Sequence, residues 1–247
     1  TIKMKKLLFL FLAITANTIF AQDEVLLRLN YENNATYSTK TIVSQEMGAM
    51  MSMEMTMDME MEVTAVENEN YDTKTKFTNM SMEMLQGGNL MTFDSSKSDD
   101  ELDAAGKMMK SQMGPMLEAV IYSKVTTLGE ASVVSIEPMI PGVEDIASQS
   151  SAVVYPKEAV KVGSTWTMSK EERGMKMDFL YTVQSISKEN VLVDVSGEVS
   201  GMGSGKITGN ITINRVSGIP IKSLIEMNLS VAEQQLKMKA ITEIAKK

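Results

Sequence analysis

The thioether side chains of methionine are the most concentrated chemical group in this sequence. Methionine occupies eight of the fifteen positions from Met47 to Met61, and from Met51 onward it alternates with polar or acidic residues. Thioethers are soft ligands that suit monovalent copper. They are also flexible and polarizable, so a methionine surface adapts to apolar partners of varied shape. The pattern therefore points either to a soft metal or to a hydrophobic partner.

Other chemistries find little support in the composition. The chain of 247 residues contains no histidine and no cysteine, which removes His-based triads, thiol nucleophiles and the usual zinc sites. Acidic residues such as Glu54 and Asp58 alternate with the methionines, and residues in such positions ordinarily form the solvent-exposed face of a strand. The segment 201–206 superficially resembles a phosphate loop, but its spacing is wrong and it joins two strands. We therefore expect a non-enzymatic protein without a cofactor.

The methionine alternation has a period of two, which predicts a β-strand with one apolar and one acidic face. A polar turn at 67–70 leads into a return strand, in which the three-residue step from Phe77 to Met80 predicts a β-bulge near 78–79. Gly87-Gly88 predicts a tight hairpin to a third strand. Centring the first turn between Asn68 and Glu69 then predicts the pairs Met57–Met80, Met55–Met82, Met53–Met84, Met84–Met91 and Met82–Phe93.

Helix signals follow the third strand. Ser98 and Glu101 form a capping-box pattern, and apolar residues from Leu102 to Val120 have helical spacing. Pro115 should kink or split this helix. We expect a helix at 98–122 that covers part of the methionine sheet.

The rest of the chain predicts further strands. Residues 25–29 alternate, a hairpin is expected at 125–136, and the last strand at about 235–244 carries lysines that suit an edge or an exposed face. The expected organisation is a signal peptide at 1–21, an N-terminal β half at 22–137, a connecting segment at 138–163 and a C-terminal β-meander at 164–247. The two halves could form one continuous sheet. The methionine strand is long, about 50 Å at 3.3 Å per residue. The predicted fold is therefore mainly β, with long antiparallel strands in a strongly curled sheet or open half-barrel and one kinked helix on the concave face.

The N-terminus predicts export from the cytoplasm. Lys3, Lys5 and Lys6 precede a short apolar run and a small residue, Ala21, at a plausible cleavage point. We expect a periplasmic or extracellular protein, not lipid-anchored because the chain has no cysteine, and without a membrane helix because no second long apolar run exists. A net charge of −8 disfavours nucleic acid as a partner.

Three stretches carry a resemblance to a known group of proteins: the end of the signal at 19–22, the segment from Tyr155 to Trp166, and the Gly-punctuated meander after it. In these features the chain resembles an uncharacterised family of exported proteins from Bacteroidota. In outline the long-stranded sheet with one helix also looks like the periplasmic lipoprotein-carrier fold, a half-barrel that holds acyl chains. Neither resemblance implies a functional residue, since fold does not fix function.

Three interpretations of the methionine face remain open. The leading hypothesis is a face that binds a hydrophobic ligand, namely an acyl chain, a lipid or an apolar peptide. The alternative is a structural or surface-interaction protein with an ordinary methionine-rich core. The lesser alternative is monovalent copper, for which the sequence assigns no ligand set, because methionines on one strand are about 7 Å apart and one ion needs neighbouring strands. The expected ligand-binding residues are Met53, Met55, Met57, Met59, Met80, Met82, Met84, Met91, Met109 and Met113.

Overall fold

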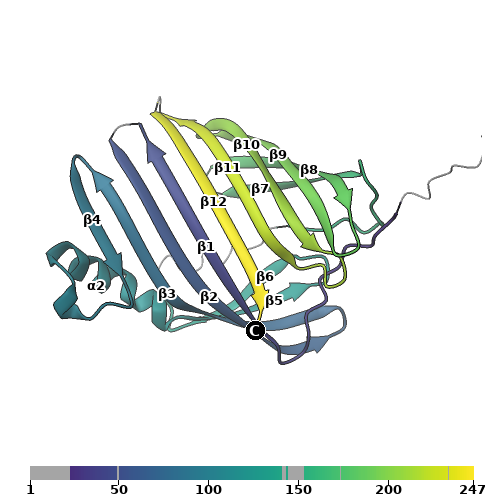
Figure 1. Ribbon diagram of the computed structural model, residues 1–247, viewed down its shortest axis with the longest axis horizontal. Helices are drawn as coiled ribbons and strands as arrows, with labels where there is room; N and C mark the ends of the chain where they lie inside the picture. The colour runs from purple at the N-terminus through teal and green to yellow at the C-terminus, as the bar shows by residue number, and fades with distance from the viewer. Residues whose placement is uncertain (1–22, 49, 141–142, 144–152, 173, 233) are drawn as a thin grey trace, which may run out of the picture.

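The computed structural model describes residues 23–48, 50–140, 143, 153–172, 174–232 and 234–247. The predicted signal peptide at 1–21 and much of the connecting segment lie outside these residues, so both remain predictions. The described chain is mainly β, as expected, with one large antiparallel sheet that does not close (Figure 1). The strands are β1 Thr36–Met47, β2 Met51–Glu67, β3 Asn70–Gln86, β4 Asn89–Asp94, β5 Val120–Thr126, β6 Ala131–Glu137, β7 Thr165–Glu172, β8 Met175–Ile186, β9 Asn190–Gly201, β10 Ser204–Asn214, β11 Pro220–Val231 and β12 Gln234–Lys246.

The two halves of the chain form one continuous sheet. The strand order is β6-β5-β3-β2-β1-β12-β11-β10-β9-β8-β7, and β4 pairs with the part of β3 that β5 leaves open. The lysine-bearing last strand therefore lies between β1 and β11, so the edge position considered for it is wrong. Its lysines Lys237 and Lys239 are exposed on the outer face, which is the other position that their charge allows.

The predicted registers around the methionine strand are confirmed. Met57 pairs with Met80, Met55 with Met82, and Met53 with Met84. The next hairpin pairs Met84 with Met91 and Met82 with Phe93. The register shifts after Asp58, opposite the predicted bulge, and this shift returns the apolar residues to one face.

The helix is shorter than expected at both ends. Ser98 does bond Glu101, but this capping box closes a separate 3-10 turn, η1 Asp99–Glu101. The helix itself, α2 Ala104–Glu118, begins after Asp103, whose side chain accepts a hydrogen bond from the Gly106 amide at 2.7 Å. Residues 120–122 instead begin β5, because β3 offers them a pairing partner. Pro115 lies inside α2 without ending it.

Glycines on the inner face allow the sheet to curl. A Cβ added at Gly209 would lie 2.1 Å from the Leu224 carbonyl oxygen, and one added at Gly205 would lie 2.2 Å from that of Asn228. Only glycine therefore permits this close approach between β10 and β11. Figure 1 shows the result: β7 to β10 curl away behind the front strands, and α2 lies beside β3 and β4.

The sheet has two distinct ends. The end that carries the β1–β2, β3–β4, β9–β10 and β11–β12 hairpins is called the rim. The opposite end, where β1 begins and β12 ends, is called the base. The base is filled by the extended segment 23–31, which we call the plug. It forms an isolated bridge, Val25 with Val160, in place of the expected strand.

Alternate residues of the plug fix it inside the base. Val25, Leu27 and Leu29 are buried in the same cluster as sheet residues from both halves. The Tyr71 hydroxyl donates a hydrogen bond to the Leu29 carbonyl at 2.7 Å, and the Leu29 amide bonds the Thr127 carbonyl at 2.8 Å. The plug therefore joins the N-terminal and C-terminal parts of the sheet.

Replacing Leu27 by alanine tests this role. Leu27 is 1% exposed, whereas its neighbour Leu26 is 55% exposed. We expect Leu27→Ala to lower the free energy of unfolding by about 2–5 kcal/mol, because it opens a cavity in the base. Leu26→Ala should change it by less than about 0.5 kcal/mol. Urea unfolding followed by circular dichroism measures both, and equal effects would contradict the assignment.

Candidate functional site

The candidate site is the concave face of the sheet near the rim. The strand registers place ten residues in one line across this face, from β4 through β1 and β12 to β7. Six of the ten are methionine and the only polar side chain is that of Gln45. We call this line the methionine row: Met91, Met84, Met53, Gln45, Met238, Met227, Ile207, Gly197, Phe179 and Met168.

The lines on either side of the methionine row are also apolar over most of their length. Toward the rim, Met51, Met47, Leu236 and Leu229 are aligned, and Met177 lies further along the same line. Toward the base the adjacent line begins with Phe93, Met82, Met55 and Val43, and continues with Ala240 and Ile225. The sheet thus presents a broad apolar band close to the rim.

Three packed clusters account for the buried part of the concave face. The base cluster holds the plug together with valine, isoleucine and tyrosine side chains of the sheet. The methionine cluster lies under α2 and contains Met57, Phe77, Met80, Phe93, Met109, Ala119, Ile121 and Val143. The rim cluster contains Val199, Ile207 and Leu229.

The predicted ligand-binding residues divide by burial. Met57, Met80 and Met109 are 7%, 0% and 5% exposed and pack within the methionine cluster, so here they act as core. Partly buried residues that pack against the same cluster include Met55, Met59, Met82, Met91 and Met113. Met53 and Met84 are also partly buried, but none of the three clusters formed by described residues includes them.

Two more methionines share the position of Met53 and Met84. Met47 and Met51 pair with each other at the β1–β2 hairpin, are partly buried, and pack in none of the three clusters of the described chain. We call Met47, Met51, Met53 and Met84 the open methionines. They lie on β1, β2 and β3, closer to the rim than the methionine cluster, and β9, β10 and β11, which build the rim cluster, lie beyond β12.

The base offers no comparable surface, because its polar groups are used for structure. The Tyr155 hydroxyl donates a hydrogen bond to the Gly218 carbonyl at 2.6 Å. Tyr31 contacts Tyr37 and Tyr71 edge-on, with ring centroids 4.9 and 5.3 Å apart. Burial raises the pKa of Tyr181 to about 12, so this phenol is neutral at ordinary pH. These tyrosines therefore have structural roles in the base.

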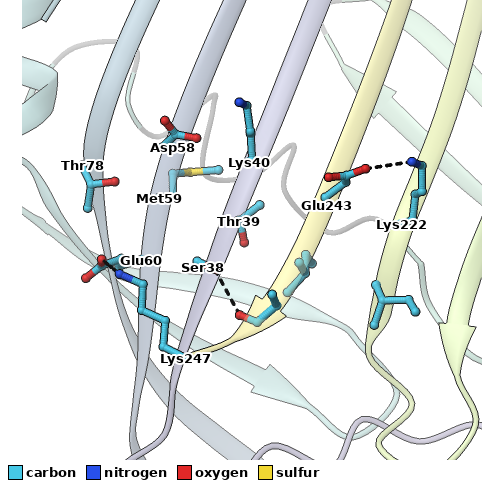
Figure 2. Close-up of a pocket in the computed structure, with 13 residues that line it drawn as sticks. Ser38, Thr39, Lys40, Asp58, Met59, Glu60, Thr78, Lys222, Glu243 and Lys247 are labelled. Carbon is cyan, nitrogen blue, oxygen red and sulfur yellow. Dashed lines mark hydrogen bonds and ion pairs between the residues drawn. The ribbon is translucent and has the colours of Figure 1, made fainter. Parts of the chain in front are cut away.

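A hollow on the outer surface is lined mainly by polar and charged side chains. It lies over β2, β1, β12 and β11 and is shown in Figure 2. Glu243 pairs with Lys222 at 2.8 Å, and Lys247 pairs with Glu60. The Lys222 ammonium lowers the pKa of the Glu243 carboxyl through a hydrogen bond. Exposed pairs of this kind keep the outer face soluble and contribute little to stability.

Among the described residues, no group of three or more histidine, cysteine, aspartate or glutamate residues could hold a metal ion. None of their helices has the length and apolar character needed to cross a membrane.

Sequence reasoning did not identify the C-terminal part of the methionine row. Met227 and Met238 are visible in their own alternating strands, but their alignment with Met53 depends on the pairing of β12 with β1. No short-range pattern specifies that pairing. Met47 and Met51 belong to the methionine-rich stretch of the sequence, and only their position at the rim singles them out.

Part of the chain is similar to a known protein family. A model of a family of unknown function, DUF6263, matches residues 145–230, which include β7 to β10 and most of β11. No curated protein matches this chain. The methionine strands β2, β3 and β4 lie outside the matched residues, so the similarity concerns the C-terminal part of the sheet.

Replacing two methionines of β3 by alanine distinguishes a methionine that packs in the core from one that lies outside the packed clusters. Met80 lies in the methionine cluster, whereas Met84 on the same face is an open methionine. We expect Met80→Ala to lower the free energy of unfolding by about 2–5 kcal/mol, because it leaves a cavity. Met84→Ala should cost less than about 1 kcal/mol, since it opens none. Urea unfolding of both variants measures the difference, and a larger cost for Met84→Ala would show that it packs as core.

Proposed function

We propose that this protein is a non-enzymatic, extracytoplasmic protein that binds the acyl chain of a lipid against the open methionines. The observation that carries the proposal is the concave apolar band at the rim, where Met47, Met51, Met53 and Met84 lie outside every packed cluster of the described chain. An apolar band of this extent is an interaction surface when protein does not cover it.

The contrast between rim and base supports a binding role. The base is built from branched and aromatic side chains that pack in fixed rotamers, as expected of a rigid core. The rim is built largely from methionine, whose unbranched side chain has three rotatable bonds and fits partners of different shape. A sheet with one rigid end and one deformable end can hold a variable ligand without losing its fold.

An acyl chain fits this face better than a peptide does. On a sheet face the backbone groups of the strands are already paired with each other, as the registers of β1, β2 and β3 show. A peptide would bring its own amide groups into the apolar band, where unpaired polar groups are costly. An acyl chain has no polar group along its length, and its head group can remain in water at the rim.

The second candidate function is structural, and one observation favours it. Met57, Met80 and Met109 pack as an ordinary core under α2. If the open methionines only complete this core in an assembly, the protein would bind no lipid. The binding experiment below separates the two functions.

A polar double substitution tests the acyl-chain site. We expect Met53→Asn combined with Met84→Asn to weaken binding of a fluorescent fatty acid at least tenfold, because apolar contact is lost and two amides are buried. Fluorescence titration of the purified protein measures this, and native mass spectrometry shows whether lipid co-purifies.

The matched control is Leu85→Asn. Leu85 follows Met84 on β3, is 45% exposed and lies on the outer face. Its substitution should leave fatty-acid binding unchanged. Absence of binding to the unaltered protein, or equal binding by the double variant when both are folded, would contradict the proposal and favour the structural role.

A further inference from the structure

We propose that Met53, Met84 and Met91 form a site for one monovalent copper ion. The three residues lie side by side on β2, β3 and β4, because Met53 pairs with Met84 and Met84 pairs with Met91. Among the described residues, this is the one position where methionines occupy three adjacent strands in register. The proposal does not depend on lipid binding.

The spacing of the strands allows three thioethers to reach one ion. Directly opposite residues have Cβ atoms about 4.5–5.5 Å apart. Methionine has three rotatable bonds, so Met53 and Met91 can lean toward Met84 from either side. The concave curvature of the sheet brings the ends of these side chains closer together than their Cβ atoms. An ion would lie over the centre of the trio.

Met91 packs against the methionine cluster, whereas Met53 and Met84 can move toward it. Met53 and Met84 are open methionines, so moving their side chains disturbs none of the three packed clusters. All three residues are partly buried, neither sealed in the interior nor fully exposed. Partial burial gives an ion a route to the site and removes part of its water shell.

The type of ligand selects the type of metal. Thioethers are soft, neutral ligands that favour Cu(I) over zinc, magnesium or calcium. The chain has no histidine or cysteine that could recruit a borderline divalent ion. Binding is a ligand exchange in which copper arrives as Cu(I) and remains Cu(I), so no electron donor or acceptor is needed.

The opposite face of the sheet adds a favourable charge. Glu54 and Glu83 are paired across β2 and β3, each one residue beyond Met53 or Met84, and both are exposed. Two carboxylates directly opposite each other repel. A cation bound to the methionines on the other side of the same strands would reduce that repulsion.

A competition titration tests the site. The full protein would be titrated anaerobically with Cu(I) held by a colorimetric chelator, and separately with Ag(I) as a redox-inert substitute. We expect one ion per chain, with methyl NMR signals of Met53, Met84 and Met91 shifting together. Affinity should be unchanged between pH 5 and pH 7, because thioethers do not protonate in that range.

Leucine substitutions identify the ligands without removing apolar volume. Met53→Leu combined with Met84→Leu should weaken Cu(I) binding at least tenfold. The control, Met227→Leu combined with Met238→Leu, changes an adjacent pair in the same row and should leave Cu(I) binding unchanged. Both double variants should keep the circular dichroism spectrum and urea unfolding midpoint of the unaltered protein, since leucine is apolar and of similar volume.

The outcomes are distinct from those for lipid binding. Absence of Cu(I) and Ag(I) binding, equal binding by the Met53/Met84 variant, or a loss of affinity on acidification that indicates carboxylate ligands would each overturn the copper site. None of these results bears on the fatty-acid titration. Failure of fatty-acid binding would in turn leave the copper site standing.

Discussion

The structure depends on the burial of the inner face of one very large open sheet. Every strand of an antiparallel sheet with one apolar face must be covered on that face, and a sheet that does not close cannot cover itself completely. The plug fills the base, and α2 packs on β4 and β3. The open methionines belong to neither of the clusters that the plug and α2 complete. The candidate site is therefore a direct result of how the sheet is covered.

Curvature and residue choice work together in this arrangement. Gly205 and Gly209 allow β10 and β11 to approach closely, which lets the C-terminal half curl toward the concave side. Branched side chains then pack at the base, where neighbouring strands and the plug fix their positions. Methionines predominate toward the rim, where fewer neighbours constrain them. Rigid side chains therefore occupy the base, where the inner face is fully covered, and adaptable side chains occupy the rim, where it is only partly covered.

Local patterns predicted the local structure well. The period-two alternation, the bulge near 78–79 and the Gly87-Gly88 turn were enough to place Met53, Met84 and Met91 in register, because hairpin pairing depends on nearby residues.

The long-range features were missed. Lysines suggested an edge for the last strand, yet β12 is internal, since the pairing of β1 with β12 depends on the whole sheet. The alternation of Val25, Leu27 and Leu29 predicted a strand, but these residues form the plug, because burial on one side does not require a continuous pairing partner. The start of the helix was also misplaced, because Asp103 caps α2 and Ser98 caps a separate 3-10 turn.

The position of β12 has a consequence for how the molecule assembles. The strand that joins the two halves of the sheet is the last of the twelve along the chain, and it pairs with β1 across some two hundred residues. Until it is in place, β1 and β11 each present a row of unpaired amide and carbonyl groups beside an apolar face. Contacts of such high sequence separation form slowly, and strand edges that stay exposed until then promote aggregation. The final thirteen-residue strand thus completes the sheet. A chain interrupted before it would consist of two half-sheets with unpaired, aggregation-prone edges, and would not be a shortened version of the same protein.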